Sequence, residues 1–98
     1  MTENFEHEVE EATRLYESTI QHAATRTRDM IERYGTVGAL SRLMISADLQ
    51  TGFKVLRDAG QLDRTFEALV VRYRDRFGPD AVEAAQWRLD HPYELIEE

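Results

Sequence analysis

One apolar stripe in the first third of the sequence constrains the fold more than any other feature. Its apolar or small residues are spaced by three or four positions, close to the 3.5-residue repeat of a coiled-coil seam. They are Phe5, Val9, Ala12, Tyr16, Ile20, Ala23, Thr27, Met30 and Tyr34. Because the segment contains neither proline nor glycine, the pattern predicts one long helix over residues 3–34 that stops at Gly35.

The rest of the chain divides into shorter apolar segments, each bounded by helix-start and helix-stop residues. Gly60 is a typical stop, Asp63 a typical cap, and Pro79 suits the first turn of a helix. We expect helices over 36–47, 48–59, 63–77 and 79–90, followed by a tail over 91–98. The alternating pattern typical of sheets is absent, so the predicted class is all-α. Residues 1–98 would form a single domain, in which a long N-terminal helix precedes a compact bundle of four shorter helices over residues 36–90.

The predicted length of the first helix suggests self-association. A helix of about 30 residues spans roughly 45 Å, whereas a domain of this size is only about 30–35 Å across. The overhanging part of the stripe would expose apolar side chains, and a second copy of the chain would cover them. We therefore expect a homodimer, with a different protein as the alternative cover and fraying of the first turns as the alternative without a partner. The expected contact residues are Phe5, Val9, Ala12, Tyr16, Ile20 and Ala23.

The charge pattern narrows the possible partners. The chain has 98 residues and a net charge of −7, which disfavours binding to nucleic acid and favours a protein partner. The acids concentrate in residues 1–23, whereas residues 24–58 are mildly basic. The candidate partner surface combines Glu8, Glu11, Arg72, Arg76 and Trp87, although solvated helix faces would give the same pattern.

Neither a membrane nor a secreted location is expected. No apolar run approaches the roughly 20 residues that span a bilayer. Residues 1–6 also lack the basic and apolar regions of a secretory signal. We therefore expect a cytoplasmic protein.

The sequence offers little catalytic chemistry. It has no cysteine and three dispersed histidines, and only His7 lies one helical turn from glutamates. We expect no enzyme activity, cofactor or metal. A helix-turn-helix is a weaker alternative: the segments Leu40–Ser46 and Leu49–Leu56 flank a polar turn, and Gln50, Thr51 and Lys54 could reach a DNA groove.

About residues 48–90 resemble a small helical module of uncharacterised bacterial and phage proteins, some of them associated with phage conflict. The residues that carry the resemblance are Thr51-Gly52-Phe53, Leu56, Gly60, Leu62-Asp63, Thr65, Glu67-Ala68-Leu69-Val70, Phe77, Ala84-Ala85 and Arg88-Leu89. The resemblance implies a helical fold and no known activity, so it transfers no catalytic residue.

Together these observations predict a non-enzymatic, α-helical protein-interaction module. One alternative is a small acidic inhibitor encoded by a phage or mobile element, of the anti-CRISPR or anti-restriction type. Its acidic surface would occupy a nucleic-acid-binding surface of its target. The other alternative is a DNA-binding regulator.

Overall fold

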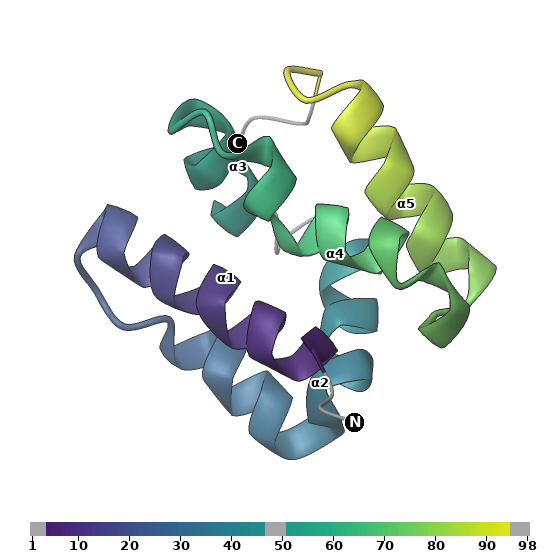
Figure 1. The fold of residues 1–98 in the computed structure, drawn as a ribbon, viewed down its shortest axis with the longest axis horizontal. Coiled ribbons are helices and arrows are strands. Elements are labelled where there is room, and N and C mark those ends of the chain that lie inside the picture. Colours follow the sequence, from purple (N-terminus) through teal and green to yellow (C-terminus); the bar gives the residue numbers. More distant parts are fainter. Residues whose placement is uncertain (1–3, 47–50, 95–98) are drawn as a thin grey trace.

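The computed structural model describes residues 4–46 and 51–94, and their regular structure is entirely helical (Figure 1). The α-helices are α1 (Asn4–Ile20), α2 (Thr25–Ile45), α3 (Thr51–Asp58), α4 (Phe66–Arg72) and α5 (Pro79–Asp90). Two short 3-10 helices, η2 (Leu62–Arg64) and η3 (Arg74–Arg76), flank α4. The predicted all-α class is confirmed. The molecule measures 38 × 31 × 22 Å.

The expected helix over 3–34 is wrong, because the chain turns back after Ile20. Figure 1 shows α1 and the first half of α2 side by side and running in opposite directions. Gln21 adopts the left-handed conformation, with φ 56°. The amide of His22 then donates to the carbonyl of Glu17 at 3.2 Å, which is the closing bond of a Schellman helix end. Glycine is the usual residue at this position, so glutamine gave no stop signal.

Gly35 bends α2 instead of ending it. Its backbone has φ 79° and ψ 168°, a region open essentially to glycine alone. The predicted stop is therefore a change of direction inside α2. After the bend, the second half of the helix packs against α4 and α5 (Figure 1).

The core lies where α1, the second half of α2, α4 and α5 meet. From α1, Phe5, Val9 and Ala12 are buried. The ring of Phe5 is 1% exposed and meets Tyr73 edge-on, with ring centroids 4.9 Å apart. The other buried members are Leu40, Leu43 and Met44 from α2, Leu69 and Val70 from α4, and Ala81 and Ala85 from α5. Half of the predicted self-association stripe thus packs inside its own chain, because the folded-back α1 does not overhang.

The remaining helix ends agree with the sequence in part. Helix α5 has the bounds predicted from Pro79. The predicted helix over 63–77 is wrong at both ends. Helix α4 is capped by Thr65 instead of Asp63, and it ends at Arg72 before the separate turn η3. The Thr65 hydroxyl accepts from the amide of Ala68 at 3.1 Å and donates to the carbonyl of Leu62 at 2.8 Å. The start of the predicted helix over 48–59 lies outside the described residues.

We predict that Gln21→Gly stabilises the protein by about 0.5–1 kcal/mol, because glycine occupies the left-handed region without the Cβ penalty. Gly60 provides the matched control. It ends α3 with φ 74° and the same bond type, from the amide of Gln61 to the carbonyl of Leu56 at 2.8 Å. Gly60→Ala should destabilise by about 1–2 kcal/mol. Urea denaturation measures both changes, and a Gln21→Gly variant less stable than the natural chain would contradict this account of the turn.

Candidate functional site

An open apolar groove of about 380 Å³ lies between α1, the start of α2, α3 and α4. Its apolar lining comprises Ala12, Tyr16, Ile20, Ala23, Ala24, Leu43, Met44, Phe53, Leu56 and Phe66. Tyr16 and Ile20 are half-buried, and Ala23 is exposed. The groove is open rather than an enclosed cavity, and its lining is mainly apolar with polar residues such as His22 and Arg26 among it.

Two helices form the walls of the groove. The α1 stripe leaves the core after Ala12 and continues along one wall as Tyr16 and Ile20, one helical turn apart. The facing wall is α3, whose Phe53 and Leu56 are each 3% exposed. The six predicted self-association residues are thus divided. Phe5 and Val9 lie in the core, Ala12 belongs to both places, and Tyr16, Ile20 and Ala23 line the groove.

A buried ion pair lies behind the groove. Arg88 of α5 donates to the Oε2 of Glu67 in α4 at 2.7 Å, and their side chains are 5% and 4% exposed. The same guanidinium donates to the carbonyls of Leu43 at 3.3 Å, Met44 at 2.7 Å and Ser46 at 3.4 Å. Burial raises the pKa of Glu67, and the hydrogen bond from Arg88 opposes that shift. Because both groups are held in these bonds, the pair closes the end of α2 and offers the groove no free acid or base.

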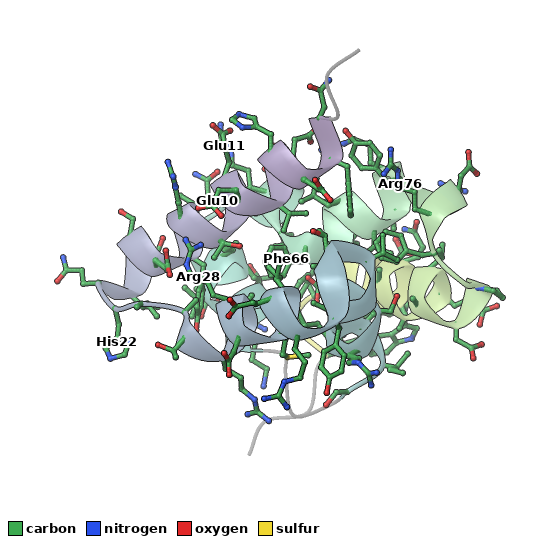
Figure 2. All side chains as sticks on the ribbon, turned by 90° about the horizontal axis from the view of Figure 1, so that it is seen from below. Glu10, Glu11, His22, Arg28, Phe66 and Arg76 are labelled. Carbon is green, nitrogen blue, oxygen red and sulfur yellow. The ribbon has the colours of Figure 1, made fainter. Side chains whose placement is uncertain are left out.

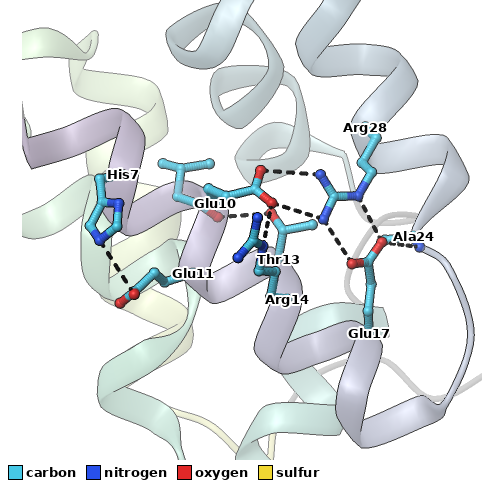
Figure 3. Close-up of polar contacts among 9 residues, drawn as sticks. His7, Glu10, Glu11, Thr13, Arg14, Glu17, Ala24 and Arg28 are labelled. Atoms are coloured by element: carbon cyan, nitrogen blue, oxygen red, sulfur yellow. Dashed lines mark hydrogen bonds and ion pairs between the residues drawn. The ribbon is translucent and has the colours of Figure 1, made fainter.

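A second ionic cluster joins α1 to α2 (Figure 3). Glu17 accepts from the Nε of Arg28 at 2.8 Å and, through the same oxygen, from the amide of Ala24 at 2.8 Å. Arg28 also donates to both carboxylate oxygens of Glu10, each at 3.1 Å, and Arg14 donates to Glu10 at 2.8 Å. Figure 2 shows Glu10 and Arg28 between the two helices, with Glu11 on the outer side of α1.

This cluster shifts the pKa of its members in the directions that stabilise their charges. The hydrogen bonds from Arg28 and from the Ala24 amide lower the pKa of Glu17 from 4.5 to about 2. Hydrogen bonds from Arg28 and Arg14 also lower the pKa of Glu10, and the carboxylates raise the pKa of Arg28. The negative charges of Glu10 and Glu17 are therefore compensated by arginines of the same chain.

The candidate partner surface is brought together only in part. Glu8 forms an ion pair with Arg72 and accepts from the hydroxyl of Tyr73 at 2.6 Å. Glu8, Glu11 and Arg72 border one shallow hollow of about 190 Å³. The guanidinium of Arg76 lies 5.2 Å from the ring centroid of Phe5.

Trp87 contributes a different contact. It lies on α5, is 45% exposed and stacks on His91, with ring centroids 4.5 Å apart. His91 is the cap residue that follows the last residue of α5, so a contact within the chain holds the half-exposed ring of Trp87 in place.

Other predicted sites gain no support from the geometry. His7 pairs with Glu11 at 3.3 Å, and no group of three potential metal ligands occurs among residues 4–46 and 51–94. Helix α3 packs chiefly against α1, whereas a helix-turn-helix would pack it on the preceding helix. Gln50 lies outside the described residues. In the described part of the chain, no helix is both long enough and apolar enough to cross a membrane.

Comparisons of the chain with protein-family models, with curated proteins and with solved structures found no match. The resemblance of residues 48–90 to a conflict-associated module therefore stays a prediction.

We predict that Glu17→Gln lowers the melting temperature near neutral pH by roughly 4–8 °C, the equivalent of about 1 kcal/mol. Glutamine retains an acceptor for the Ala24 amide but loses the charge that Arg28 binds. Because folding lowers the pKa of Glu17, its contribution is present above pH 4.5 and is lost as the pH falls toward about 2.

The difference between Glu17→Gln and the natural chain should therefore shrink as the pH falls below 4.5 and disappear near pH 2. Glu6→Gln is the control, since it removes an equal charge from an exposed position of the same helix. Thermal melts followed by circular dichroism at several pH values measure both variants. A difference that stays constant with pH would mean that the ion pair is not its source.

Proposed function

We propose that this protein is a non-enzymatic protein-interaction module whose groove binds an amphipathic helix of a partner protein. The observation that carries the proposal is the groove itself, in which α1 and α3 present facing apolar walls. The groove has a volume of about 380 Å³ and opens to solvent. A partner helix would add its apolar stripe to these walls, which is a recurrent mode of peptide recognition.

The polar groups near the groove favour binding over catalysis. The Thr13 hydroxyl donates to the carbonyl of Val9 at 2.8 Å, and Glu67 is held by Arg88. A general acid or base needs a free position within hydrogen-bonding reach of its substrate. Because Thr13 and Glu67 are already paired, the buried part of the groove suits apolar side chains. The polar lining residues His22 and Arg26 are exposed.

A partner of different sequence is favoured over a second copy. The prediction of self-association rests on an overhanging helix, which would leave its whole stripe exposed. Phe5 and Val9 now lie in the core, and only the end of the stripe, at Tyr16 and Ile20, remains open. Two such ends provide less apolar area than a continuous coiled-coil seam.

Ion pairs within the chain weaken the alternative that the protein is an acidic inhibitor. A mimic of nucleic acid needs carboxylates that are free to meet a basic target. Glu8, Glu10 and Glu17 are each bound to an arginine of this chain. Those carboxylates would have to exchange an existing partner before they could bind another.

We expect a random peptide library displayed on phage to yield ligands with apolar residues spaced three and four positions apart. Ile20→Lys should abolish their binding, because it places a charge in the groove, and Glu6→Lys is the control on the outer part of α1. The proposal is supported only if the selected peptides show this spacing and also fail to bind Ile20→Lys. Peptides without helical spacing, or equal binding to Ile20→Lys, would overturn the proposal. A stable dimer that Ile20→Lys dissociates would also overturn it in favour of a second copy.

A further inference from the structure

The arginines of this chain fall into two groups. Most are held by carboxylates or backbone carbonyls, as for Arg28 and Arg88 above. By contrast, no hydrogen bond or ion pair joins Arg26, Arg33 or the distant Arg64 to any other residue in the described part of the chain. The guanidinium of Arg42 lies over the ring of Tyr34 at 3.9 Å. Arg26, Arg33 and Arg42, termed here the arginine face, line a single hollow of about 520 Å³. In an acidic chain this concentration of uncompensated positive charge needs a reason.

The bend at Gly35 creates this hollow. Arg26 and Ile45 border the same space although they lie at opposite ends of α2. In a straight helix these positions would be roughly 28 Å apart along the axis. Because Gly35 has a backbone conformation that other residues rarely adopt, the concave shape depends on that glycine.

The hollow combines charge with exposed apolar surface. Ile45 is 64% exposed and Tyr34 is 42% exposed, both high values for large apolar side chains. The lining contains one acid, Asp29, so three positive charges face one negative charge. Exposed apolar groups within a charged rim are typical of protein-binding surfaces.

We infer that the arginine face docks an acidic segment of another protein, with one apolar side chain of that segment packed against Ile45. The carboxylates of the segment would pair with Arg26 and Arg33. We take the occupant to be a different protein, since Glu8, Glu10 and Glu17 of this chain are already bound to its own arginines. A dimer that Arg33→Glu dissociates would assign the face to a second copy instead. This inference uses residues outside the groove except for Arg26, which borders both hollows, and it does not depend on the helix-binding proposal.

Single-stranded nucleic acid fits the same surface less well. Stacking needs an accessible aromatic face, and Arg42 covers one face of Tyr34. A net charge of −7 also opposes the approach of a polyanion at long range. A short acidic peptide carries fewer charges and supplies the apolar group that Ile45 can bind.

The test uses fluorescein-labelled peptides of glutamate and glycine, with and without one central leucine, titrated with the protein and followed by fluorescence anisotropy. We expect the leucine peptide to bind more tightly, and added salt to weaken it. Arg33→Glu should weaken binding by about tenfold, and Ile45→Ser should remove the advantage of leucine. Arg64→Glu is the control: it makes the same change in net charge at an exposed residue away from the hollow and should change affinity by less than about twofold.

Three further results would overturn the inference. Arg64→Glu could weaken binding as much as Arg33→Glu, which would mean that net charge alone causes the loss of affinity. The two peptides could bind equally, which would remove the apolar contact. A single-stranded oligonucleotide could bind the arginine face more tightly than the leucine peptide, which would assign the face to nucleic acid. Ile20→Lys should leave peptide binding unchanged, so failure of the groove proposal remains distinguishable from failure of this one.

Discussion

The buried guanidinium of Arg88 joins three helices from inside the molecule. It reaches from α5 to the carboxylate of Glu67 on α4 and to three carbonyls at the end of α2. The last carbonyls of a helix have no partners within the helix, and they carry the negative end of its dipole. One positive side chain therefore satisfies both the carboxylate and the helix end, which makes burial of the charge tolerable. The groove depends on this arrangement, because Leu43, Met44 and Glu67 all line it.

Other arginines link α1 to the helices that it packs against. Arg28 pairs with Glu10 and Glu17 of α1 from the start of α2, and Arg72 pairs with Glu8 from α4. The resulting position of α1 places Phe5 and Val9 in the core and leaves Tyr16 and Ile20 beside α3. The acidic N-terminal segment is thus an internal structural element as much as a surface. Of the arginines without a carboxylate partner, Arg26, Arg33 and Arg42 lie together around one hollow of the bent helix α2.

The sequence predicted what local patterns determine. Helical periodicity gave the all-α class, and Pro79 and Gly60 marked helix ends correctly. The prediction failed at Gln21, a non-glycine residue whose left-handed conformation ends α1. It also missed Arg88, although the spacing Ala81, Ala85, Arg88 places that arginine on the buried face of α5. The groove was beyond prediction because its walls meet only after the unexpected turn between α1 and α2.

A double-mutant cycle on Arg88 and Glu67 tests the central role of the buried ion pair most directly. The free energy of unfolding in urea would be measured for Arg88→Met, for Glu67→Leu and for the double variant. We predict that each single substitution costs about 3–5 kcal/mol, since it leaves a buried charge or helix end unpaired. The loss of unfolding free energy in the double variant should be smaller than the sum of the two single losses by more than about 1 kcal/mol. Strictly additive losses, or single losses within about 0.5 kcal/mol of zero, would contradict the account.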